Sequence, residues 1–259
     1  MKPASPASRF LGLLAKIICC TVLSGAAVAA CAQGCEPPKD MHPEQGQKPT
    51  TEQLNKLGIW FAEHEQYGCA ADVFAASLQG DPNQSDGRHI VFLFGAALYL
   101  SGDVKEAIPV LQQAENIGYR DQRLNLMLAQ ALDSQHAAAD AEDEWRKALA
   151  FDPESANILE LLSNDLLSEG KFAETIAVLD TPRLGPVRTP QLALNLATAY
   201  EKTQKPEAAE RILQDAFNSN PDSMEIANAL AGLLTQRNRK AEADFVLKLA
   251  RARQGQTAN

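Results

Sequence analysis

The chain has 259 residues, of which 45% are hydrophobic and 6% aromatic, and it carries a formal net charge of −9. This length holds one or two compact domains, or a short array of repeats that each pack only on their neighbours. Nucleic-acid phosphates and anionic lipids repel so acidic a protein, and no basic stripe along the chain reverses that balance. The composition therefore argues against a nucleic-acid partner.

Residues 1–32 have the pattern of a cleaved secretory signal. An apolar stretch at 17–30 follows three basic residues, and no acidic residue comes before Glu36. The stretch is shorter than the ~20 residues that a membrane-spanning helix needs, so a retained anchor is the weaker alternative. Two cleavage sites remain open. An ordinary signal peptidase would cut after Ala32, whereas residues 28–31 resemble a bacterial lipobox, which is cut before Cys31 and leaves that cysteine acylated as a membrane anchor.

The cysteine count favours one disulfide in the exported protein. Cys19 and Cys20 leave with the signal, and Cys31 is either removed or acylated, so Cys35 and Cys69 remain as an even pair. An oxidising compartment favours their pairing, which would tie the N-terminal tail to the first helical hairpin. Two unpaired thiols are the alternative. Residues 33–50 are otherwise rich in Gln, Pro, Gly and Lys, and we expect a flexible tether there.

From Thr51 onward the chain repeats every 34 residues. Frames of that length run over residues 51–84, 88–121, 122–155, 156–189, 190–223 and 224–257. The eighth and twentieth places of every frame hold small residues. The seventh, eleventh and twenty-fourth places hold large apolar ones, such as Leu128, Leu132 and Trp145 in the third frame. Helices that cross closely need this combination, because small residues let the backbones approach and bulky ones fill the grooves beside them.

This pattern resembles the tetratricopeptide repeat (TPR) family and covers residues 51 to about 255. The resemblance implies an all-α fold, a right-handed α-solenoid of about six helix-turn-helix hairpins that follows the signal segment. The fourth frame departs from the pattern because Pro182 and Pro186 interrupt it, and Pro190 follows directly after it. Proline removes a helical hydrogen bond and clashes with the preceding turn, so the second helix of this hairpin should stop near Asp180.

No catalytic or metal-binding constellation stands out in the sequence. The four histidines have no partner at metal-ligand spacing, and we expect no cofactor and no metal. Acidic pairs such as Glu142 and Asp143 are interpreted as solvated charge on exposed helix faces. Beyond the signal and the tether, the chain has no room for a separate catalytic domain. We therefore expect a protein that is not an enzyme.

The resemblance implies that the first helix of each hairpin lines a concave groove, chiefly through its second, fifth, ninth, twelfth and thirteenth places. An apolar patch there would mark an interaction site, with aromatic anchors. The alternative is that some of its members pack between hairpins. The candidate partner-binding residues are Phe92, Tyr99, Leu100, Leu126, Gln130 and Asn164.

Two functions follow from these expectations. The favoured one is an extracytoplasmic scaffold or adaptor, periplasmic or held to a membrane by a lipid on Cys31, that binds a peptide or partner protein in the groove. The other is a structural subunit of an envelope or outer-membrane complex, which would use its outer or terminal faces. The sequence leaves the oligomeric state open.

Overall fold

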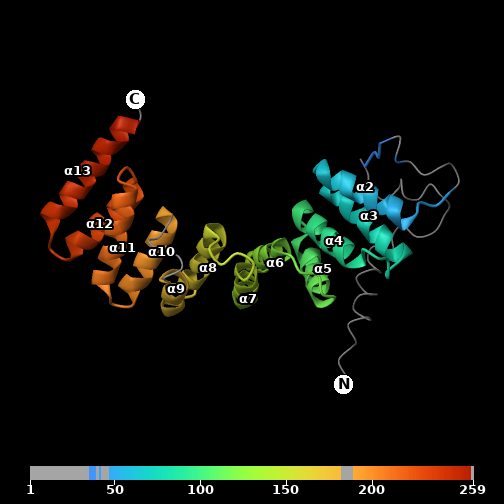
Figure 1. Cartoon of the computed structure of the whole chain (residues 1–259), viewed down its shortest axis with the longest axis horizontal. Coiled ribbons are helices and arrows are strands. Elements are labelled where there is room, and N and C mark those ends of the chain that lie inside the picture. Colours follow the sequence, from blue (N-terminus) through green and yellow to red (C-terminus); the bar gives the residue numbers. More distant parts are fainter. Residues whose placement is uncertain (1–34, 39–40, 42–46, 182–188, 258–259) are drawn as a thin grey trace, which may run out of the picture. The chain divides into compact units, whose positions relative to one another are not determined.

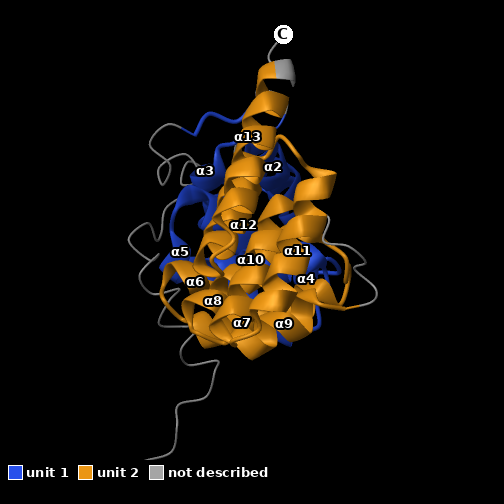
Figure 2. Ribbon diagram, turned by 90° about the vertical axis from the view of Figure 1, so that its left-hand side faces the viewer, with its two compact units in different colours: residues 1–131 blue, residues 132–259 orange. Residues whose placement is uncertain are grey.

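The structure is a computed structural model that describes residues 35–38, 41, 47–181 and 189–257. The predicted signal segment, with Cys31, lies outside the described residues. Within them, twelve α-helices and no strands are present (Figure 1). The all-α prediction is confirmed for this part of the chain. The structure divides into two compact units, residues 1–131 and 132–259, which are coloured separately in Figure 2.

Unit 1 contains two complete hairpins. Helices α2 and α3 pack together, α4 and α5 pack together, and α3 packs against α4. The boundary between the units falls within the next helix, α6. The helices are α2 (Thr51–Glu63), α3 (Tyr67–Gly80), α4 (Gly87–Ser101), α5 (Val104–Asn116) and α6 (Gln122–Ser134).

In unit 2, α7 packs against α8, and the three hairpins α8/α9, α10/α11 and α12/α13 follow. The first helices of neighbouring hairpins also touch, α8 with α10 and α10 with α12. The helices are α7 (Ala138–Leu149), α8 (Ala156–Ser168), α9 (Phe172–Leu179), α10 (Pro190–Lys202), α11 (Pro206–Ser219), α12 (Met224–Gln236) and α13 (Lys240–Thr257).

The turn inside each hairpin has the same geometry six times. The residue at the fifteenth place of the frame always has a positive φ: Glu65, Gly102, His136, Gly170, Gln204 and Asn238. The next residue donates its N–H to the carbonyl five residues earlier, as from Asp103 to Leu98 at 2.9 Å and from Lys171 to Leu166 at 2.8 Å. This hydrogen bond links the first and the sixth residue of the turn, and it satisfies a carbonyl that would otherwise lack a partner at the helix end. Five of the six first helices therefore end at the thirteenth place of their frame, and α4 ends one residue later.

Small residues sit where the helices of a hairpin cross. A Cβ on Gly58 would lie 2.6 Å from the ring of Phe74, and one on Gly95 would lie 2.7 Å from Leu111 Cδ2. Both glycines stand at the eighth place and both partners at the twenty-fourth. The alternation of small and large residues in the sequence thus corresponds to a direct contact inside the hairpin.

The fourth hairpin is shortened. Helix α9 ends at Leu179, as the prolines predict, and residues 182–188 lie outside the described residues. Asp180, directly after the helix, accepts a hydrogen bond from the hydroxyl of Tyr200 on α10. Burial and this neighbouring carboxylate raise the pKa of Tyr200 to about 12. A side-chain bond therefore joins the end of the truncated helix to the next hairpin.

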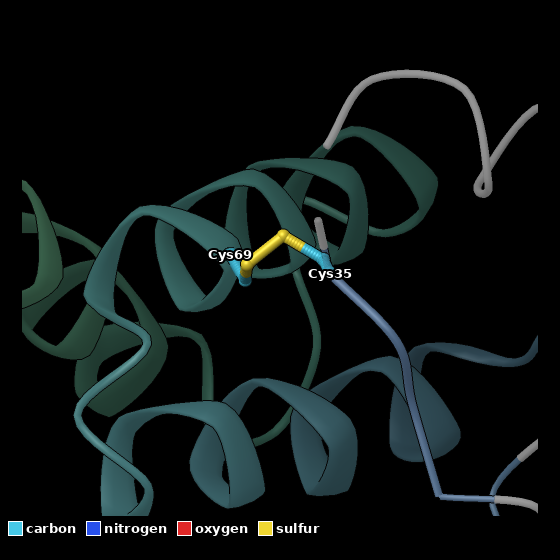
Figure 3. Close-up of a disulfide and its surroundings, with 2 residues drawn as sticks. All are labelled: Cys35 and Cys69. Carbon is cyan, nitrogen blue, oxygen red and sulfur yellow. A yellow bond between two sulfur atoms is a disulfide. The ribbon is translucent and has the colours of Figure 1, made fainter. Parts of the chain in front are cut away.

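The N-terminal segment is fixed to the first hairpin. Cys35 and Cys69 form a disulfide, with Cα atoms 5.8 Å apart, that joins the segment to α3 (Figure 3). Cys35 and Met41 are partly buried against the core cluster of α2, α3 and α4, which includes Phe61 and Phe74. The covalent bond and the apolar contacts therefore hold these two residues of the expected tether on the hairpin.

No helix among the described residues is long and apolar enough to cross a lipid bilayer.

Candidate partner-binding surface

Phe92, the expected aromatic anchor of the groove, lies inside the packing of unit 1. Its side chain is only 2% exposed. The ring of Tyr119 stacks on it, with centroids 4.8 Å apart and planes 15° from parallel, and the Arg123 guanidinium lies 5.8 Å from its centroid. The expectation that Phe92 belongs to an exposed patch is thus wrong. It packs between elements, which was the alternative.

Tyr119 is the residue that sequence reasoning missed. It stands at the thirty-second place of its frame, where Pro82, Pro153 and Pro221 stand in others. Its hydroxyl lies 3.2 Å from His89 Nδ1 and 3.4 Å from an oxygen of Asp121. A tyrosine in place of proline was the signal in the sequence that this position has another role than closing a turn.

A fixed ion pair completes this cluster. Asp121 caps α6 by accepting the backbone N–H of Arg123 at 2.8 Å, and it also accepts from Nε and Nη2 of the same arginine. The hydrogen bonds from Arg123 hold the pKa of Asp121 below its ordinary value, although partial burial opposes this. The charge of Arg123 is therefore already matched within unit 1, so Arg123 stabilises the cluster and is a poor candidate for an anion site.

The other four candidates in unit 1 remain accessible, and together with Ile59, which the sequence reasoning did not include, we call them the unit 1 face: Ile59, Tyr99, Leu100, Leu126 and Gln130. Leu100 is 45% exposed and Ile59 39% exposed, while the remaining three are half-buried. The hydroxyl of Tyr99 on α4 donates to Oε1 of Gln130 on α6 at 3.3 Å. That bond shows that the twelfth place of one first helix and the ninth place of the next lie on one side of the unit.

In unit 2 the corresponding surface is polar, and we call it the unit 2 face: Glu160, Asn164, Gln191 and Asn195. Asn195 Nδ2 donates to Asn164 Oδ1 and to the Ser163 hydroxyl, both at 2.8 Å, and Asn195 Oδ1 accepts from Gln191 Nε2 at 2.9 Å. Asn195 is buried, whereas Asn164 is exposed. The network fixes the amide of Asn164 while its own Nδ2 makes no hydrogen bond within the described part of the chain.

Glu142 is not the solvated charge that the sequence indicated. It is 9% exposed and accepts from Lys171 at 2.6 Å and from Arg146 at 2.8 Å. Burial disfavours its ionisation, but the two hydrogen bonds outweigh this and hold its pKa below the ordinary value. The exposed neighbour Asp143 fits the original interpretation. Glu142 thus joins α7 to the turn that precedes α9.

No group of three or more potential metal ligands lies close together within the described ranges. His64 stacks on Trp60, with centroids 4.0 Å apart, and its Nδ1 lies 2.8 Å from the Trp60 carbonyl. His136 lies in the turn after α6. His64 is therefore held against Trp60, and His136 is part of a hairpin turn.

Solved structures of TPR proteins share this fold. A tetratricopeptide repeat protein from Parabacteroides merdae matches with a TM-score of 0.58 and 14% identity, over 76% of this chain and 77% of its own. The MamA protein matches at 0.57 and 16%, over 68% and 96%, and YrrB, described as a TPR protein with an unusual peptide-binding site, at 0.56 and 17%, over 68% and 90%. No family model and no curated protein matches the chain. The chain therefore has the TPR fold, an all-α solenoid.

Proposed function

We propose that this protein is a non-catalytic interaction scaffold that binds a peptide or a partner protein along the exposed side of its first helices. The observation that carries this is the amide of Asn164, which Asn195 and Gln191 hold in place while its Nδ2 stays open to solvent. A pre-positioned donor loses little entropy on binding and can bond a peptide carbonyl. The description of YrrB as a TPR protein with an unusual peptide-binding site supports this proposal.

The protein is proposed to work outside the cytoplasm. The Cys35–Cys69 disulfide supports this, because such bonds persist in oxidising compartments and are rare in the cytosol. The signal pattern of residues 1–32 points the same way, and Cys31 would carry the lipid if the lipobox is used. Labelling cells with a radioactive fatty acid tests whether Cys31 carries a lipid. In that case wild type would be labelled and Cys31→Ser would not. Absence of label in wild type would favour the soluble form.

Site-specific crosslinking tests the binding surface. A photo-crosslinking amino acid is placed at Leu126 or Asn164 in one set of variants, and at Arg211 on the exposed side of α11 as the control. We expect one and the same protein to be captured from both of the first two positions and not from position 211. Capture from position 211 alone would show that the second helices carry the contact and would overturn the proposal.

A structural subunit is the second candidate, and Phe245 is the observation that favours it. This residue on α13 is 65% exposed. It stands at the twenty-second place, which is exposed in every frame and holds Asp72, Pro109, Asp143, Ala177 and Arg211 in the others. An aromatic side chain at a solvated place marks a contact surface on the second helices. Crosslinking from position 245 to a component of an envelope complex would favour this function.

A further inference from the structure

The thirteenth place of the frame lies at the end of every first helix and is exposed in all six repeats. Leu100 is the apolar residue at this place; the other frames hold Glu63, Ser134, Ser168, Lys202 and Gln236. The array thus accepts polar side chains here in five repeats out of six. The 45% exposure of Leu100 is therefore not required by the packing of the hairpin.

The twelfth and ninth places of the frame also hold more apolar residues in unit 1 than in most later frames. The twelfth place holds Tyr99, where the later frames hold Asp133, Leu167, Glu201 and Thr235. The ninth holds Ile59, where the later frames hold Ala96, Gln130, Asn164, Thr198 and Gly232. The bonds from Tyr99 to Gln130 and from Asn195 to Asn164 show that the sixth, ninth and twelfth places of neighbouring first helices share one side of each unit. Leu100 and Ile59 are the exposed large apolar residues at these places among the described residues, whereas in unit 2 Leu167 is half-buried and most of the other residues are polar.

The edge of this surface carries negative charge. The helix ends and turns at residues 62–66 and 99–103 contain three carboxylates and no lysine or arginine. The three are Glu63, Glu65 and Asp103, which are all exposed. None of them makes an ion pair within the described part of the chain. The carboxylate of Asp103 accepts the hydroxyl of Ser101 at 2.9 Å. These three carboxylates are therefore available to basic groups of a partner.

An apolar surface with a carboxylate edge favours a partner that is apolar at its centre and basic at its flanks. We propose that the unit 1 face binds a segment of a partner protein in which a bulky apolar side chain, packed against Leu100, is flanked by lysine or arginine. The apolar side chain supplies the buried contact, and the basic flanks meet Glu63, Glu65 and Asp103. This inference rests on the proposed function and narrows its partner class.

Synthetic peptides test the charge and the anchor separately. The first probe carries leucines between pairs of lysines, the second has glutamates in place of the lysines, and the third has serines in place of the leucines. Binding of each fluorescein-labelled probe to the purified, disulfide-bonded protein is measured by anisotropy at low and at high salt. The first probe is expected to bind at least about tenfold more tightly than the other two, with a preference over the glutamate probe that shrinks as salt screens the edge.

Substitutions taken from other frames provide matched variants. Leu100→Ser and Glu63→Lys introduce the residues found at the same place in frames three and five, so both should leave the fold intact. Leu100→Ser should weaken the lysine probe about fivefold or more. Glu63→Lys should reduce the preference for lysine over glutamate. Ile117→Ser, which introduces the residue type of Ser219 at the same place of the frame, removes exposed apolar surface elsewhere, and Glu106→Lys reverses a charge on α5; both controls should bind like wild type.

Three results would overturn this inference: equal binding of the lysine and glutamate probes, full binding by Leu100→Ser, or no binding of any probe to wild type. The crosslinking experiment then separates the two proposals. If the partner captured from position 126 or 164 is still captured, the scaffold function stands and only the partner class is wrong. If that capture also fails, both are wrong.

Discussion

Trp145 on α7 donates its indole N–H to a carboxylate oxygen of Asp165 on α8 at 2.7 Å. Both residues are exceptions at their places. The twenty-fourth place holds Phe or Leu in the other frames, and the tenth holds Asp165 where four other frames hold Ala or Leu. The indole is almost fully buried and needs an acceptor. The carboxylate in the following hairpin supplies it, so two departures from the repeat compensate each other.

Removing the acceptor should therefore be costly. Asp165→Leu leaves the indole N–H buried without a partner, and we expect it to lower the free energy of unfolding by about 1–3 kcal/mol. Asp165→Asn keeps an oxygen acceptor. Chemical denaturation of both variants checks this, and equal stability of Asp165→Leu and wild type would show that the bond contributes nothing.

The pH dependence of Asp165 has a definite sign. Burial raises the pKa of this carboxyl above its ordinary value of 3.8, the indole hydrogen bond partly opposes the shift, and the carboxylates of Asp133 and Glu169 add to it. Just above pH 3.8 the folded state therefore holds the proton more often than the unfolded state, and stability falls as pH rises through this window. Asp165→Asn should lose that dependence and should be as stable as wild type, or slightly more stable, near pH 7.

Glu142 should show the opposite dependence. Burial disfavours its charge, but the hydrogen bonds from Lys171 and Arg146 place its pKa below the ordinary 4.5. Its contribution to stability is then present above pH 4.5 and is lost as pH falls through the lowered pKa. We expect Glu142→Gln to cost roughly 1 kcal/mol at pH 7 and progressively less in acid. Asp143→Asn, at the exposed neighbour, is the control and should match wild type at both pH values.

The repeated turn offers a backbone test. Gln204 has a φ of 57°, a conformation that costs a residue with a side chain but suits glycine. Gln204→Gly should therefore raise the free energy of unfolding by about 0.5–1 kcal/mol, and Gly102→Ala, at the equivalent place, should lower it by a similar amount. Thermal unfolding of the two variants checks the pair. A loss of stability in Gln204→Gly would mean that glycine's extra freedom in the unfolded chain outweighs the relief of strain.

Breaking the disulfide should destabilise unit 1. Cys35 and Cys69 are 34 residues apart in sequence, and closing a loop of that length contributes ~3–4 kcal/mol in the chain-entropy model. Cys35→Ser should lower the stability of the unit by about that amount, as should reduction of wild type. Hydrogen exchange resolves the effect by region, and protection in α2 and α3 should fall while that in α12 stays unchanged. Equal loss in both regions would contradict a local role.

The fold could be predicted from the sequence because it depends on a short-range rule applied many times. The contacts from Gly58 to Phe74 and from Gly95 to Leu111 each join the eighth and twenty-fourth places, and their alternation of size is visible in every frame. The end of α9 at Leu179 likewise follows from local proline chemistry. Six copies of one rule make each single deviation easy to recognise.

The details of the surface could not be predicted, because they depend on contacts that are not part of the repeat pattern. Phe92 is buried because Tyr119, from the other end of the same frame, stacks on it. Glu142 is buried because Lys171 reaches it from 29 residues away. Leu100 has no such partner and remained exposed. A side chain's place in the frame gives the side of the helix on which it lies, but the covering side chains decide whether it meets solvent.

The disulfide also sets how far the repeats can extend from whatever precedes them. Residues 36–50 would span up to about 50 Å if extended. The disulfide bypasses this length, because it holds Cys35 directly on α3. If Cys31 bears a lipid, only three residues lie between that anchor and Cys35, a span of about 14 Å at most. The oxidised protein would then keep its first hairpin within that distance of the bilayer surface, and reduction would release the longer reach.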